Sequence, residues 1–321
     1  LSELTTKFSE NVLDATQAWF KQIESESELA GLPEHTKVAA KQAAEDRGLS
    51  GWVLTLDFPV YYAVVLHAES RQLREEIYHA YSTRASEVGP HSTEWDNSPL
   101  IDQILTLRLE LAELLGFDNY ADYSLATKMA QSTEQVIQFL DDLAARSKPQ
   151  AEQEVSELRS FAEATGEIDQ LEPWDLAYYA EKLKQQRFKI SQQELRPYFP
   201  MPRVLQGLFH VAGKLFDVEF KELSDFDTYH ADVRLLELSR QGETLAYCYL
   251  DPFARSGKRS GAWMDDCRVR RQTGEGLQLP VAYLVCNFTP PVGDEPALLT
   301  HDEVTTLFHE FGHGLHHMLT Q

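Results

Sequence analysis

Apolar residues recur at three- and four-residue spacings through the first two thirds of the chain. Leu105, Leu109, Ala112 and Leu115 form one such series. This spacing places apolar side chains on one face of an α-helix. Residues 1–217 are therefore predicted to form a helical region.

Two helices are expected around Pro149. One is predicted from about Thr133 to Arg146, and Ser147 with Pro149 resembles the start of a second that reaches about Thr165. Proline is tolerated in the first turn of a helix but not in its interior. The sequence thus predicts a break in what would otherwise be one long helix.

From about Val218 the pattern changes to the alternation that is typical of β-strands. The segment VRLLELSRQGETLAYCYLD holds two strand-like runs on either side of Gln241–Gly242, and PVAYLVCNF (280–288) is rich in apolar and β-branched residues. Residues 218–321 are predicted to hold a small sheet and a final helix. The expected fold class is mainly α with a small β-sheet beside that helix.

The final helix is predicted to begin near His301, because Thr300 and Glu303 have the spacing of a capping box. The residues that gather on one side of its helical wheel are Val304, Leu307, Phe308, Phe311, Leu315 and Met318. His309 and His313 fall roughly opposite this apolar stripe. They are therefore expected to face away from the core.

The pentapeptide His309-Glu310-Phe311-Gly312-His313 carries the candidate chemistry. In an HExxH helix two imidazoles four residues apart can bind one Zn²⁺, and the glutamate can activate the metal's water. His309 and His313 are the candidate metal ligands, and Glu310 is the candidate catalytic base. The alternative is a chance match on a solvated helix face, but the capping box and the preceding strand favour a zinc site.

Nearby polar residues do not obviously supply a third zinc ligand. His317 is about 12 Å along the helix axis from His309, so one ion cannot bridge them, and both His316 and His317 are expected to be solvated. Asp265 and Asp266 in GAWMDDC are adjacent on a predicted strand. Their side chains should point to opposite faces, which favours a structural role.

Charge and cysteine content narrow the function classes. With 51 acidic and 29 basic residues the formal net charge is -22, which argues against binding of nucleic acid or of an anionic membrane. The three cysteines, Cys248, Cys267 and Cys286, form no C-x-x-C pair, so a reducing, cytoplasmic setting is expected. No secretory leader or membrane-spanning run is expected either. We expect a monomer with a small or peptide-like partner.

Many segments resemble the thimet oligopeptidase family of zinc peptidases, most closely its bacterial members. They include LTLDFPVYY, REEIYHAYSTRAS, LLGFDNYADYSLATKMA, GAWMDDC, PVAYLVCNF and LTHDEVTTLFHEFGHGLHHMLT, and they extend from near residue 50 to the end. The resemblance implies a mainly α, two-lobed fold with a channel between the lobes. It also implies a cytoplasmic zinc metalloendopeptidase that hydrolyses short peptides with one zinc ion per complete site.

Matched residue by residue, the resemblance makes His309 and His313 the first two zinc ligands and Glu310 the general base. It makes the strand at 280–288 the sheet edge that pairs with substrate. The family's third ligand, a glutamate, would lie some tens of residues beyond the motif, after Gln321. We therefore expect an internal fragment that binds zinc weakly and cleaves little by itself. The alternative is a non-catalytic peptide-binding or scaffold protein on the same fold.

Overall fold

The computed structural model describes residues 1–255, 257–291 and 296–320, and the chain forms two compact units. The first unit consists of Leu1–Leu32, Val53–Leu56 and Val64–Arg187. The second consists of Pro33–Trp52, Asp57–Ala63 and Phe188–Gln321. Each unit is therefore assembled from separate stretches of chain. The division of the sequence at residue 217 stays a prediction.

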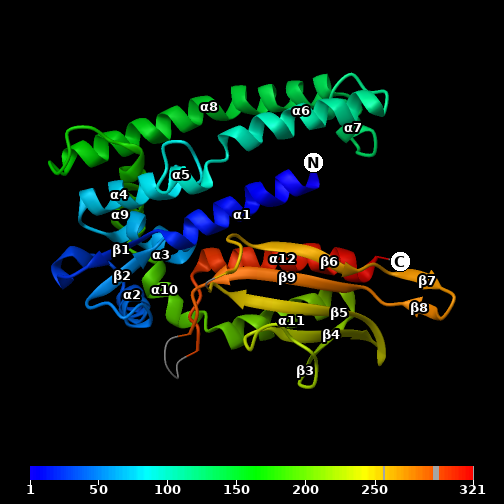
Figure 1. The fold of residues 1–321 in the computed structure, drawn as a ribbon. Helices are drawn as coiled ribbons and strands as arrows, with labels where there is room; N and C mark the ends of the chain where they lie inside the picture. The colour runs from blue at the N-terminus through cyan, green and yellow to red at the C-terminus, as the bar shows by residue number, and fades with distance from the viewer. Residues whose placement is uncertain (256, 292–295, 321) are drawn as a thin grey trace. The chain divides into compact units, whose positions relative to one another are not determined.

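Helices dominate the first unit (Figure 1). Its elements are α1 (Ser2–Ala18), β1 (Phe20–Ile23), η1 (Glu26–Leu29), β2 (Trp52–Thr55), the last turn of α3 (Phe58–His67), α4 (Arg71–Ser82), α5 (Ser92–Trp95), α6 (Ser98–Leu114), α7 (Tyr120–Leu125), α8 (Thr133–Ala164), η2 (Pro173–Asp175) and α9 (Leu176–Phe188). The helix predicted around Leu105 is confirmed as α6. Only Ala112 of its predicted apolar series is buried, whereas Leu105, Leu109 and Leu115 are exposed.

Helix α8 runs from Thr133 to Ala164 without a break, so the predicted second start at Ser147 is wrong. Pro149 lies inside the helix, where its nitrogen cannot donate to a carbonyl in the preceding turn. The residues around Pro149 are exposed, so water can solvate the carbonyl that is left unpaired. Neither α8 nor any other helix in the described ranges is both long and apolar enough to cross a membrane.

A five-stranded sheet forms the centre of the second unit, in the order β3-β4-β5-β9-β6. Its strands are β3 (Glu219–Leu223), β4 (Arg234–Arg240), β5 (Glu243–Phe253), β6 (Trp263–Arg268) and β9 (Val281–Phe288), and a separate hairpin joins β7 (Arg271–Thr273) to β8 (Gly276–Gln278). The two strands predicted around Gln241–Gly242 are confirmed as β4 and β5. Both turn residues have positive φ angles, which suit a tight hairpin.

Strand β9 is central rather than at the edge, so the prediction that residues 280–288 form the sheet edge is wrong. It pairs with β5 in parallel on one side and with β6 antiparallel on the other. Its burial pattern mainly alternates, with Ala282, Leu284, Cys286 and Phe288 buried, so one face of the strand lies in the core. The edge on this side of the sheet is β6.

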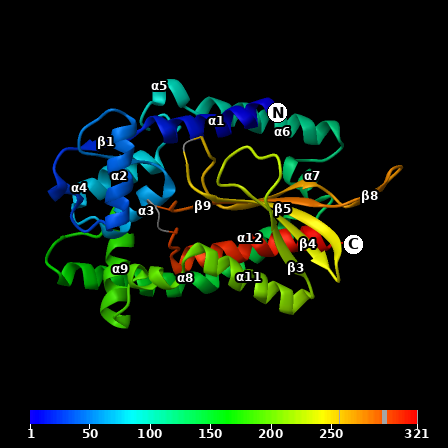
Figure 2. The same ribbon diagram turned by 90° about the horizontal axis from the view of Figure 1, so that it is seen from below.

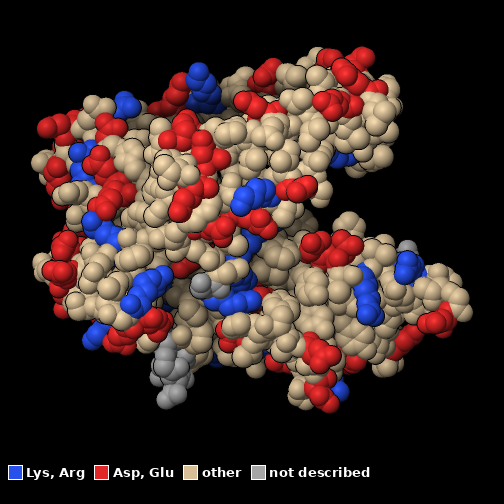
Figure 3. All heavy atoms as spheres, viewed as in Figure 1, with Lys and Arg blue, Asp and Glu red and all other residues tan. Residues whose placement is uncertain are grey.

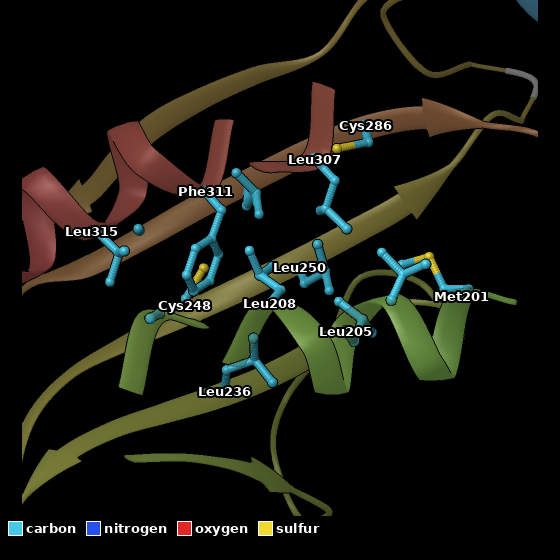
Figure 4. Packing of buried hydrophobic residues seen from close by; sticks show 14 of the residues in the cluster. Met201, Leu205, Leu208, Leu236, Cys248, Leu250, Cys286, Leu307, Phe311 and Leu315 are labelled. Atoms are coloured by element: carbon cyan, nitrogen blue, oxygen red, sulfur yellow. The ribbon is translucent and has the colours of Figure 1, made fainter. Parts of the chain in front are cut away.

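Helices α11 (Met201–Phe216) and α12 (His301–Leu319) lie against the same face of this sheet (Figures 1 and 2). The second unit also holds α2 (Glu34–Asp46), the first part of α3, α10 (Gln192–Leu195) and η3 (Arg196–Tyr198). Alternate residues of the strands enter the core beneath the two helices. Cys248, Leu250 and Cys286 are among them (Figure 4).

The start of α12 and most of its buried side agree with the predictions from the sequence. The Thr300 hydroxyl accepts a hydrogen bond from the Glu303 amide at 3.1 Å, and the Glu303 carboxylate accepts one from the Thr300 amide at 2.7 Å. The buried residues of the predicted stripe are Leu307, Phe311, Leu315 and Met318, and Val304 is partly buried. Phe308 is 38% exposed, so its assignment to the stripe is wrong.

We predict that Phe311→Ala lowers the free energy of unfolding by about 3–5 kcal/mol, because it leaves a cavity in this core. Phe311 is 2% exposed, and its ring centroid lies 5.4 Å from that of Phe220. Phe308→Ala makes the same chemical change on the exposed side of α12 and should cost less than about 1 kcal/mol. Urea denaturation of both variants tests this, and equal losses would contradict the packing described above.

Candidate functional site

His309 and His313 lie one helical turn apart on the exposed side of α12. Their Nε2 atoms are 3.1 Å apart, and the two rings are inclined at 83°. Two nitrogens that bind one tetrahedral Zn²⁺ at roughly 2.0–2.1 Å are separated by about 3.3 Å. The donor set and its spacing therefore fit a shared zinc ion.

The described part of the chain brings together two imidazoles but no complete metal site. Within residues 1–255, 257–291 and 296–320, no three His, Cys, Asp or Glu side chains are grouped so that they could hold a metal ion. The assignment of His309 and His313 as metal ligands, and of Glu310 as base, stays a prediction. A further ligand from another segment would be required.

Glu310 and His313 line a groove of about 590 Å³. Residues at the start of β6 also line it, namely Ala262, Trp263 and Met264. Farther along α12 the lining residues are His316, His317 and Thr320. The polar face of α12 and the beginning of the edge strand thus enclose one open space.

The strand beside this groove, β6, forms one edge of the sheet. Among the described strands β6 is hydrogen-bonded to β9 alone. An edge strand has N–H and C=O groups on its outer side that the sheet does not use. Sequence reasoning missed Trp263 and Met264, because strand order depends on pairing between distant segments. The exposed Asp265 and Asp266 that follow them were the one available signal of an edge.

The other polar residues named from the sequence fall into two groups. Asp265 and Asp266 are exposed on β6, and no metal-binding cluster within the described ranges includes them. His316 is exposed, as predicted. His317 is not simply solvated, because its Nε2 donates a hydrogen bond to the Arg268 carbonyl at 2.9 Å. This bond ties the end of α12 to the end of β6.

A buried ion network anchors the segment that leads into β6. The Asp251 side chain is almost fully buried and accepts hydrogen bonds from two guanidinium nitrogens of Arg255 at 2.6 and 2.8 Å. Lys258 Nζ donates to the same carboxylate at 2.9 Å. It also donates to the carbonyls of Asp251, Phe253 and Cys286, so one ammonium group joins the end of β5, the following loop and β9.

The charge state of this network is set by its hydrogen bonds. Burial alone would raise the pKa of Asp251, but hydrogen bonds from Arg255 and Lys258 outweigh it and hold the pKa below its usual range. The Tyr229 hydroxyl donates to the same carboxylate at 3.2 Å. Because the folded-state pKa of Asp251 is lowered, its stabilising contribution is present above the unfolded pKa and is lost as pH falls through the folded value.

Comparison with known proteins shows a consistent relationship along the whole chain. The model of peptidase family M3 matches residues 64–321. Oligopeptidase A of Haemophilus influenzae is 54% identical over 100% of this chain and 47% of its own length, and that of Escherichia coli is 54% identical with 48% covered. Dipeptidyl carboxypeptidase of Escherichia coli is 34% identical over 98% of this chain and 46% of its own length. The chain spans about half the length of these relatives.

We predict that Lys258→Met lowers the free energy of unfolding by about 3 kcal/mol, because it removes a buried cation from a buried carboxylate. Hydrogen exchange at residues 262–264 should also become faster, since the loop before β6 loses its anchor. Lys221→Met removes an exposed lysine from β3 and should change stability by about 0.5 kcal/mol or less. If the two variants unfolded alike in urea, the network would not have the anchoring role described.

Proposed function

Because this chain belongs to peptidase family M3, we propose that it contributes part of the active site of a zinc-dependent metalloendopeptidase for short peptides. The observation that carries this proposal is the 3.1 Å separation between the Nε2 atoms of His309 and His313. Glu310 follows the first of these ligands in the sequence and lines a groove beside an edge strand. The peptidase names of the relatives support the same class of reaction.

The polar face of α12 supplies two roles in this proposal. His309 and His313 would hold the zinc ion together with a ligand outside the described part of the chain. When bound, zinc acts as a Lewis acid that polarises the scissile carbonyl and lowers the pKa of the attacking water. The Glu310 carboxylate accepts the proton of that water and later passes it to the leaving amine.

The edge strand β6 supplies the proposed peptide-binding wall. An extended peptide can add to a sheet edge through backbone hydrogen bonds, while its alternate side chains enter neighbouring pockets. Trp263 and Met264 line the groove on this side, and Glu310 and His313 line it from α12. A peptide paired with β6 would therefore pass the candidate catalytic residues. A compact, folded segment cannot make these backbone bonds, which favours short, unfolded substrates.

We further propose a cytoplasmic monomer that does not bind nucleic acid or a membrane. Acidic side chains are spread over the face drawn in Figure 3, consistent with the net charge of -22. The three cysteines are unpaired, and two of them are buried. Burial raises the pKa of the Cys248 thiol to about 12, so little of the reactive thiolate forms at neutral pH.

We predict that Glu310→Gln in the full-length protein lowers kcat for a short peptide by about 10²–10⁴-fold without loss of bound zinc. The substitution removes the proton acceptor but leaves both imidazoles. His309→Ala should instead release the metal. Asp302→Asn, an exposed charge change in the first turn of α12, should alter neither property. Peptide cleavage and metal content are measured on the same samples.

These variants also distinguish the competing function. A peptide-binding scaffold would bind peptides without cleaving them, and its affinity would not change with a chelator or with Glu310→Gln. Cleavage that survived Glu310→Gln would contradict the role proposed for this carboxylate.

We predict that the 321-residue chain alone binds zinc at least about 100-fold more weakly than the full-length protein. Loss of a residue that only hydrogen-bonds to a metal ligand can already lower metal affinity by up to about 100-fold, and loss of a ligand itself should lower it at least as much. The two imidazoles of the chain would lack the third protein ligand. Native mass spectrometry reports polypeptide mass and bound metal together. Robust, chelator-sensitive cleavage by material verified to end at Gln321 would refute the prediction.

A further inference from the structure

A second pocket, of about 490 Å³, lies wholly within the first unit. It is formed by the end of α3, the segment after α8 and one face of α9. On α9 the lining residues Tyr178, Glu181, Lys182 and Gln185 follow one another at helical spacing. The pocket shares no lining residue with the groove beside α12.

Glu181 is the most buried charged group of this pocket, with 6% of its surface exposed. Its Oε1 accepts a hydrogen bond from Gln185 Nε2 at 3.0 Å. Its Oε2 accepts none from the residues that the structure describes. This oxygen is not among the fully buried side-chain atoms that lack a partner, so it is open to the pocket and can accept a hydrogen bond from a ligand there.

His67 faces the same space from the end of α3. Its side chain is half-buried and makes no hydrogen bond with any residue in the described ranges. Burial lowers the pKa of His67, and the negative charge of Glu181 offsets this only in part. A neutral imidazole has one nitrogen with a free lone pair, which can accept a hydrogen bond.

The pocket has more negatively than positively charged side chains. Lys182 Nζ lies 3.4 Å from a Glu167 carboxylate oxygen and 4.4 Å from the centroid of the Tyr178 ring, so its charge already has partners. Glu69 and Glu181 form no ion pair with any residue in the described part of the chain. The pocket therefore combines excess negative charge with a neutral hydrogen-bond acceptor.

The walls of the pocket are held rigidly. Gly31 has a φ of +85°, and a Cβ there would lie 2.1 Å from the His67 carbonyl oxygen, so glycine is required for this close approach. Arg74 donates to the fully buried Asp175 at 2.9 Å, which fixes the start of α9. The Arg74 guanidinium also lies 3.9 Å from the Tyr178 ring centroid. A preformed pocket loses little entropy when it binds a ligand.

We propose that this pocket binds the primary ammonium group of a small organic amine. An ammonium has three N–H donors and one positive charge. Glu181 Oε2 accepts one donor, the His67 ring nitrogen accepts another, and Glu69 adds a second negative charge at the same site. An excess of carboxylates over lysine favours an amine that carries no carboxylate, such as a diamine. The amino terminus of a peptide offers the same ammonium chemistry.

Isothermal titration calorimetry with putrescine tests the proposal on the wild-type chain and on variants. Glu181→Gln preserves the side-chain shape and an oxygen for Gln185 but removes the charge, and it should weaken binding by about tenfold or more. Glu69→Gln, at an exposed position, should weaken binding several-fold without affecting the fold. Glu113→Gln removes an exposed carboxylate of α6 outside the pocket and should leave the affinity unchanged. Thermal unfolding confirms that each variant is folded.

Two further ligands complete the experiment. Tetramethylammonium has the charge but no N–H donor, so binding as tight as that of putrescine would overturn the proposal. So would the absence of putrescine binding at roughly 10 mM, or an affinity that Glu181→Gln and Glu69→Gln leave unchanged. Glycylglycine that binds with the same dependence on Glu181 would identify a peptide amino terminus as a source of the ammonium. Binding of putrescine without glycylglycine would identify a free amine. These results do not depend on peptidase activity.

Discussion

Burial of one side of α12 against the sheet fixes the direction in which this helix presents its polar residues. Leu307, Phe311 and Met318 are almost fully excluded from solvent. Each residue turns the helix by about 100°, so His309 and His313 must then project from the opposite side. A rotation that buried either imidazole would also expose Phe311 to water. The direction in which the imidazoles project and the groove beside them both depend on this apolar contact.

A buried cation provides the second constraint, because it holds the loop that precedes the edge strand β6. Lys258, in the loop after β5, connects the Asp251 carboxylate with carbonyl groups from β5 and β9. Buried ion pairs often add little net stability, since desolvation opposes the attraction between the charges. Their geometry is nevertheless specific, because each donor needs an acceptor at the right distance. Here that geometry ties the loop before Trp263 to the centre of the sheet and so defines the wall of the groove.

Sequence reasoning succeeded where the deciding interactions are local. The capping box at Thr300 and the hairpin at Gln241–Gly242 each involve residues within one or two turns of chain. It failed where contacts with a distant segment, or exposure to solvent, determine the structure. The place of residues 280–288 in the sheet depends on pairing with β5 and β6, and the exposure of Phe308 depends on which neighbours cover it. The break predicted at Pro149 was wrong because the helix is exposed there, so water can hydrogen-bond to the carbonyl that the proline leaves unpaired.

The same distinction between local and distant interactions applies to the proposed metal site. Two ligands four residues apart are about 6 Å apart along the helix axis, so their side chains can converge on one ion. A third ligand on that face would be about 12 Å from the first, so it must come from another segment of the fold. Tight zinc binding would therefore require a contact between distant segments, even though two of the candidate ligands lie within five residues of sequence. The wall formed by β6, in contrast, lies within the same compact unit as α12. The proposed peptide binding along β6 and the proposed metal binding at His309 and His313 would therefore depend on different contacts.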